Sequence, residues 1–139
     1  MEVVLDPGVY VSALIAPKGA PAQLLDLLLE DRFRVVVSAR LLDEPTRVLL
    51  RPKFRRYAST ADVHTFVAEL SAIATMAEDQ PHPPRVTRDR GDDYLVALAV
   101  AARADALVSG ERDLTEFTAA GVTVLTPRAL LDQLAASSR

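Results

Sequence analysis

The chain has 139 residues, with 16 lysines and arginines against 19 aspartates and glutamates, and a formal net charge of −3. This length is typical of one domain that buries a substantial core, and the acidic balance speaks against bulk, charge-driven binding of nucleic acid. The lack of cysteine excludes a disulfide framework, a thiolate metal site and a cysteine nucleophile. We expect a single domain over residues 1–139.

Nothing in the sequence indicates export or membrane insertion. No basic segment near Met1 leads into an apolar run with a cleavage site, so no signal peptide is visible. No uncharged apolar stretch approaches the roughly 20 residues that a membrane-spanning helix needs. We therefore expect a cytoplasmic protein.

The first half of the chain alternates short apolar runs with helical patterns. Residues 2–5 and 33–37 are rich in β-branched side chains and predict buried strands. Helices are predicted from Val9 to Ile15, from Pro21 through Leu29, and after Ser38, which is a suitable N-cap. The helix through Leu29 is more apolar than one buried face requires, which indicates contact with another chain.

The second half continues the alternation. We predict helices at 60–74, from Asp92 or Asp93 to about 103, at 114–120 and from Pro127 through Leu134; strands at 106–109 and 122–125; and a frayed end at 135–139. Strands that alternate with helices imply right-handed crossovers and a parallel sheet covered by helices on both faces. The predicted class is therefore α/β.

Acidic residues follow two of the predicted strands. Asp6 comes directly after the first, and Glu111 and Asp113 follow the strand at 106–109. Sites in parallel sheets form outside the carboxyl ends of the strands, so this topology brings the three acids to one edge. Gathered carboxylates need a cation, and all-oxygen ligands suit Mg²⁺ or Mn²⁺. Such a site is well suited to phosphodiester hydrolysis.

Each acid also has a purely structural interpretation. Asp6 before Pro7 is a good N-cap, Asp92 or Asp93 is a natural helix start, and Glu44 fits a solvated helix surface. A phosphatase-like or receiver-like domain would instead use Asp6 as a nucleophile with a lysine near a later strand end, and the sequence has no lysine there.

Four segments, in order along nearly the whole chain, resemble the motifs of PIN-domain proteins, of the kind represented by the ribonuclease toxin of VapBC toxin–antitoxin pairs. They are residues 3–14, where the family has a strand ending in Asp-Thr-Asn; 44–57, similar to its glutamate-bearing helix; 92–99, similar to its third acidic motif; and 107–114, where Val-Thr-Gly-Asp-Arg-Asp-Leu is usual.

The resemblance implies a three-layer α/β/α fold with a central parallel sheet. It also implies Mg²⁺- or Mn²⁺-dependent endonucleolytic cleavage of RNA by the toxin of a toxin–antitoxin pair, with an antitoxin partner and a homodimer. The implied catalytic acids are Asp6, Glu44, Asp93 and Glu111; the implied metal ligands are Asp6, Asp93, Glu111 and Asp113; and Ser109 and Asp92 are implied to support them.

Three positions depart from the family pattern. Pro7-Gly8 replaces Thr-Asn, and the loss of such orienting groups typically costs about 10–100-fold in metal affinity or activity. Pro45 follows Glu44 inside a predicted helix, where proline kinks the axis. Glu111 stands where Asp is usual, and octahedral Mg²⁺ tolerates displaced oxygens poorly. The sequence is compatible with a retuned nuclease or with a catalytically impaired PIN-fold protein that binds an antitoxin or RNA.

Two groups of basic residues are candidate RNA contacts. Arg51 and Lys53 belong to a patch with aromatic residues that either holds an RNA backbone or only solvates a helix end. Arg88 and Arg90 precede Asp93 directly, so phosphate contact is better supported for that pair.

Overall fold

The computed structural model describes residues 1–85, 90–110 and 122–137. Its core is a parallel sheet with the strand order β3-β2-β1-β4-β5. The strands are β1 (Glu2–Leu5), β2 (Arg34–Val37), β3 (Thr75–Met76), β4 (Ala106–Val108) and β5 (Val124–Leu125). Because β1 lies between β2 and β4, its carboxyl end opens at the middle of the sheet edge.

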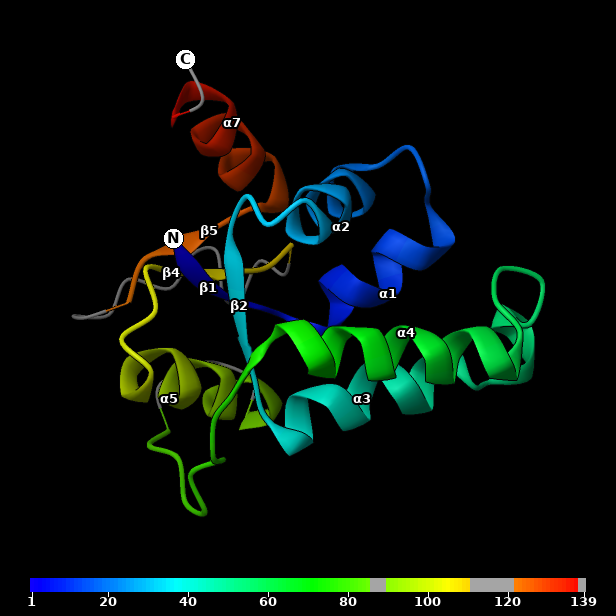
Figure 1. Ribbon diagram of the computed structural model, residues 1–139. Helices are drawn as coiled ribbons and strands as arrows, with labels where there is room; N and C mark the ends of the chain where they lie inside the picture. The colour runs from blue at the N-terminus through cyan, green and yellow to red at the C-terminus, as the bar shows by residue number, and fades with distance from the viewer. Residues whose placement is uncertain (86–89, 111–121, 138–139) are drawn as a thin grey trace.

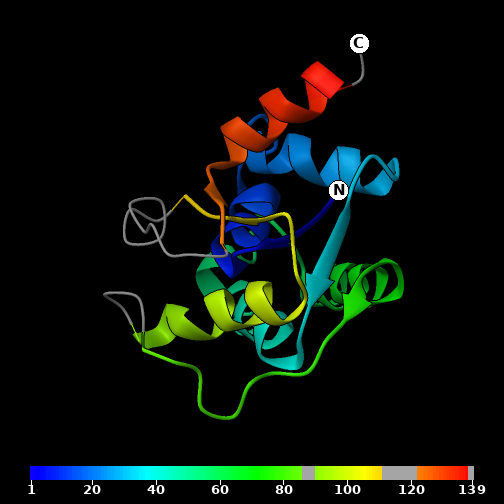
Figure 2. The same cartoon turned by 90° about the vertical axis from the view of Figure 1, so that its left-hand side faces the viewer.

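Helices cover both faces of this sheet. They are α1 (Pro7–Ile15), α2 (Ala20–Leu29), α3 (Ala39–Leu49), α4 (Thr60–Ile73), α5 (Asp93–Ala101) and α7 (Pro127–Ser137), with short 3-10 helices η1 (Pro52–Phe54) and η2 (Arg90–Asp92). Figures 1 and 2 show α2 and α7 on one side of the sheet and α3 and α5 on the other. The predicted three-layer α/β/α fold with a central parallel sheet is confirmed.

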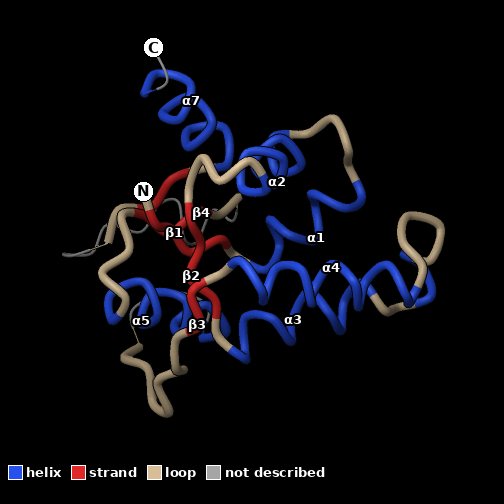
Figure 3. The backbone as a smooth tube through the Cα atoms, in the orientation of Figure 1, coloured by secondary structure: helices blue, strands red, loops and turns tan. Residues whose placement is uncertain are grey.

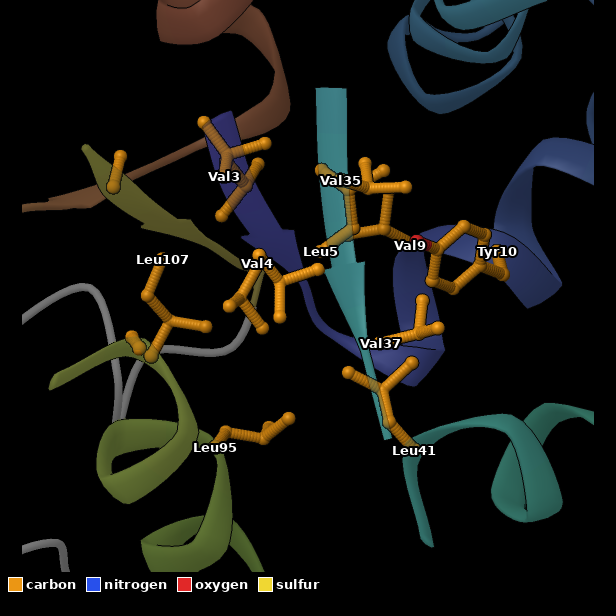
Figure 4. Packing of buried hydrophobic residues seen from close by; sticks show 14 of the residues in the cluster. Val3, Val4, Leu5, Val9, Tyr10, Val35, Val37, Leu41, Leu95 and Leu107 are labelled. Carbon is orange, nitrogen blue, oxygen red and sulfur yellow. The ribbon is translucent and has the colours of Figure 1, made fainter. Parts of the chain in front are cut away.

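The core lies between the sheet and the helices on its two faces. Figure 4 shows the Val4 side chain between Leu107 of β4 on the left and Tyr10 of α1 on the right, with Leu95 of α5 below it. Val4 and Leu107 are fully buried, as expected for central strands of a parallel sheet. In the part of the chain that the structure describes, no helix is both long and apolar enough to cross a membrane.

Local capping explains where several helices begin. The Ser38 hydroxyl accepts a hydrogen bond from the Leu41 amide at 3.2 Å, as predicted for the start of α3. Ser59 and Asp62 form a reciprocal capping box at the start of α4. The helix α3 continues through Pro45, which is buried, so the proline does not end it. Glu44 therefore keeps a helical position.

Beyond shifts of one or two residues at several element ends, the structure differs from the predicted elements at β3 and at the end of the last helix, and the short helices η1 and η2 were not predicted. The edge strand β3 pairs with β2 directly after α4, where no strand was predicted. The last helix extends to Ser137, so the predicted fraying from residue 135 is wrong for 135–137. The predicted helix at 114–120 lies outside the described residues.

Replacing Tyr10 with Phe is expected to raise the free energy of unfolding. The Tyr10 side chain is fully buried, and its hydroxyl has no hydrogen-bond partner among the described residues. A buried polar group without a partner costs about 1–3 kcal/mol, so its removal is expected to stabilise the fold by about 1 kcal/mol in urea denaturation. Tyr57→Phe, at a side chain that is 43% exposed, is the control and is expected to be neutral.

The same substitution should flatten the dependence of stability on alkaline pH. Burial raises the pKa of the Tyr10 phenol far above the ordinary value. Above pH about 10 the Tyr10 phenol ionises in the unfolded chain but not in the folded one. The free energy of unfolding is therefore unaffected by this group below pH about 10 and falls at higher pH. Equal alkaline slopes for the wild type and Tyr10→Phe would contradict this assignment.

Candidate active site

Asp6 is held at the carboxyl end of β1, where the strand passes into α1. It is the N-cap of α1, and its Oδ1 accepts a hydrogen bond from the Gly8 amide at 2.7 Å. Its side chain is only 7% exposed. The capping role that the sequence allowed is therefore real, but it occupies only one of the two carboxylate oxygens.

The second oxygen of Asp6 connects β1 to β4. Asp6 Oδ2 accepts a hydrogen bond of 2.6 Å from the hydroxyl of Ser109, which directly follows β4 and is fully buried. This places Ser109 against Asp6, where the resemblance implied a supporting residue. A short hydrogen bond to a charged acceptor is among the stronger ones, so it fixes the orientation of the carboxylate.

A cleft of about 240 Å³ opens beside Asp6. It is lined by Asp6, Gly8, Val9, Ser12, Pro21, Gly110 and Pro127. A Cβ atom at Gly8 would lie 3.4 Å from Asp6 Oδ1, at the close end of ordinary van der Waals contact. Gly8, one of the departures from the family pattern, therefore leaves the space beside the carboxylate open.

Glu44 is tied to the helix that carries the other acidic pair. The Tyr94 hydroxyl of α5 donates a hydrogen bond to Glu44 Oε1 at 3.3 Å, and the Arg40 guanidinium lies 4.1 Å from the centre of the Tyr94 ring. Arg40 and Glu44 are four residues apart on α3, so both reach the same aromatic side chain. The link therefore joins α3 to α5 directly beside Asp93.

The protonation of Tyr94 supports this arrangement. Burial and the negative charge of Glu44 raise the pKa of the Tyr94 phenol far above the ordinary value, and the charge of Asp6 acts in the same direction. The phenol therefore stays protonated and remains a hydrogen-bond donor to Glu44.

Asp92 and Asp93 occupy the start of α5. Asp93 is the first residue of the helix and is 3% exposed, whereas Asp92 is its half-buried N-cap. The helix packs against β1 and β4, the two strands that carry Asp6 and Ser109 at their ends. The helix that carries Asp92 and Asp93 thus packs on the two strands whose ends hold Asp6 and Ser109, although these residues are far apart in the sequence.

The remaining predicted site residues divide into two groups. Glu111, Asp113 and Arg88 lie outside the described residues, and so does the side chain of Arg90, whose backbone belongs to η2. Arg51 and Lys53 are exposed and follow the C-terminal end of α3, and neither lines the cleft beside Asp6.

Tyr94 and Arg40 were not predicted as part of the site. The spacing of four residues between Arg40 and Glu44 was the signal available in the sequence.

The chemistry of the donor atoms fits a hard divalent cation. The described acids and Ser109 offer only oxygen atoms, which suits Mg²⁺ or Mn²⁺. Within residues 1–85, 90–110 and 122–137, no three acidic or histidine side chains gather closely enough to hold a metal ion. Two of the four predicted ligands, Glu111 and Asp113, belong to the segment outside these ranges.

Comparison with known proteins identifies the family. Residues 2–113 match the family model described as PIN domain. The chain belongs to the PIN domain family. This PIN domain is also 29% identical over 115 residues to the uncharacterized protein MJ1680 of Methanocaldococcus jannaschii, an alignment that covers 82% of the chain and 73% of the relative.

Two solved structures share the fold of this PIN domain. One is VapBC2 from Rickettsia felis bound to a DNA fragment from their promoter, with a TM-score of 0.63 at 11% identity, covering 91% of this chain and 98% of the other. The second is PAE2754 from Pyrobaculum aerophilum, with a TM-score of 0.62 at 19% identity, covering 98% and 90% of the two chains. At these identities the similarity shows the fold alone.

Proposed function

We propose that this PIN domain is a Mg²⁺- or Mn²⁺-dependent endoribonuclease and the toxin of a toxin–antitoxin pair. The observation that carries the proposal is the Asp6 carboxylate, buried at the end of the central strand and oriented by the Ser109 hydroxyl at 2.6 Å. Burying a carboxylate is costly unless it is paired or bound to a cation. Membership of the PIN domain family and the VapBC2 neighbour support the same function.

The residues of the chain would divide the work of phosphodiester hydrolysis. A bound divalent ion supplies a water of lowered pKa and stabilises negative charge on the phosphate. Asp6 and Asp93, with Glu111 and Asp113, would hold that ion, and Ser109 would keep Asp6 in one rotamer. Glu44, fixed by Tyr94, would hold or accept a proton at the edge of the site.

Cleavage of single-stranded RNA with and without Mn²⁺ tests the proposal. The wild type is expected to cleave in Mn²⁺ and to stop when EDTA removes the metal, because the carboxylates alone cannot activate water. Calorimetry with Mn²⁺ is expected to show binding to the same preparation. Cleavage that persists in EDTA would contradict metal dependence, and a folded protein that neither cleaves RNA nor binds Mn²⁺ would contradict the nuclease.

The alternative is a catalytically impaired PIN-fold protein that acts by binding an antitoxin or RNA. Pro7-Gly8 and Glu111 favour it, since both alter the surroundings of the acids. Pro45 does not, because α3 continues through it and Glu44 is held by Tyr94. Restoring Thr-Asn at positions 7 and 8, together with Glu111→Asp, should raise Mn²⁺ affinity if these departures are the cause.

An apolar groove offers a surface for the antitoxin. It has a volume of about 280 Å³ and lies between α1, α2 and α4, with Leu25, Leu29, Phe66 and Ile73 along it. Leu29 is 66% exposed and Ile73 is 48% exposed, which accords with the excess of leucine in α2. The exposed acids Asp26 and Glu69 also line the groove. We therefore place there a helical antitoxin segment that carries apolar and basic side chains.

A further inference from the structure

The strongest positive charge of this chain is concentrated at one end of α3. Five of its 16 lysines and arginines lie between Pro45 and Ala61, a stretch without any acid. They are Arg47, Arg51, Lys53, Arg55 and Arg56, and all five are exposed. The overall charge of −3 conceals this local concentration.

This charge is aligned with the candidate active site. Arg40, Glu44, Arg47 and Arg51 follow one another at intervals of four, three and four residues, which places them along one face of the helix and its end. Arg40 contacts the Tyr94 ring beside Glu44, and Arg51 lies about 10 Å farther along the helix axis than Glu44. Figure 3 shows α3 running outward to the turn that joins it to α4. Arg40, Arg47 and Arg51 therefore lie on the face of α3 and its end that leads away from the site, with Glu44 between the first two.

The turn after α3 holds its cations in place. Lys53 lies 5.1 Å from the centre of the Phe54 ring, and Arg56 lies 4.8 Å from that of Tyr57. The centres of the Phe54 and Tyr57 rings lie 6.5 Å apart. Such cation–π contacts keep the charges at the surface without neutralising them. Tyr57, which is 43% exposed, adds an aromatic ring on which a base can stack.

We propose that the face of α3 and the following turn, formed by Arg40, Arg47, Arg51, Lys53 and Arg56, is a binding track for the backbone of a single-stranded RNA on its way to the active site. The choice of RNA rests on the proposed function. Several cations spread over α3 and the following turn fit a repeating polyanion better than a single anion, because successive phosphates require successive cations.

Three of these cations can be removed without breaking an ion pair between described residues. Arg51, Lys53 and Arg56 form no ion pair with another described residue, whereas Arg47 pairs with Asp43 at 2.7 Å and Arg55 donates to the Leu50 carbonyl. The test variant is Arg51→Gln/Lys53→Gln/Arg56→Gln. The matched control, Lys18→Gln/Arg32→Gln/Arg34→Gln, removes the same charge from exposed positions elsewhere.

Fluorescence anisotropy of a labelled oligouridine RNA in EDTA measures binding without cleavage. The test variant is expected to bind at least about tenfold more weakly at low salt, and the slope of log K against log salt should fall by about 2, or 0.7 for each lost phosphate contact on a single strand. The control should keep the wild-type slope. Thermal unfolding of each variant verifies the fold.

The outcomes separate this inference from the proposed function. Unchanged affinity and slope in the test variant, an equal loss in the control, or a wild type that does not bind RNA would overturn the track. RNA binding through the track without cleavage in Mn²⁺ would uphold it and refute the nuclease. Cleavage in Mn²⁺ with an unchanged slope in the test variant would uphold the nuclease and refute the track.

Discussion

Asp6→Asn is expected to reduce Mn²⁺-dependent RNA cleavage by about 10³-fold while leaving the fold intact. Asn is as good an N-cap as Asp, so its oxygen can still accept from the Gly8 amide and α1 should keep its start. The amide group would face the Ser109 hydroxyl, which can serve as an acceptor. Only the negative charge is lost. A 10³-fold loss of rate corresponds to several kcal/mol of electrostatic stabilisation.

Single-turnover cleavage and Mn²⁺ calorimetry on the same preparations check this expectation. Asp132→Asn is the matched control, because it removes one carboxylate charge from the exposed surface of α7. It should cleave at nearly the wild-type rate. If Asp6→Asn retained wild-type cleavage and Mn²⁺ affinity, Asp6 would be a helix cap and nothing more, as one interpretation of the sequence allowed.

The elements of the fold could be predicted where local signals and burial agree. The β-branched runs of β1 and β2 and the N-cap Ser38 were predicted from such signals, and the structure has each of them. The strand β3 could not be predicted, because its two exposed residues become a strand only by pairing with β2. That pairing depends on how α4 returns the chain to the sheet.

The candidate site divides in the same way. The predicted topology brings the ends of β1 and β4 to one edge, and the hydrogen bond between Asp6 and Ser109 agrees with this, although only the family resemblance singled out Ser109. The contact of Tyr94 with Glu44 joins positions 50 residues apart on two helices, and its existence depends on how α5 packs beside α3. No spacing within either helix could indicate it. The kink expected at Pro45 did not end α3, since tertiary packing of the buried proline outweighs its low helix propensity.

The hydrogen bond between Tyr94 and Glu44 leads to the second large effect. Tyr94→Phe is expected to lower kcat about tenfold or more with little change in KM, because the ring and its contact with Arg40 remain while Glu44 loses its donor. Tyr94 would act through Glu44 as a positioning residue. In a protein that already carries Glu44→Ala, the same substitution should then have almost no further effect on kcat.

This double-mutant cycle separates positioning from a general loss of structure. If Tyr94→Phe acted by loosening the packing of α5, its effect would multiply with that of Glu44→Ala instead of vanishing. Because burial and the charge of Glu44 keep the Tyr94 phenol protonated, the loss in Tyr94→Phe should be the same at neutral and at mildly alkaline pH. A tenfold loss that persists in the Glu44→Ala background would show that Tyr94 acts by another route.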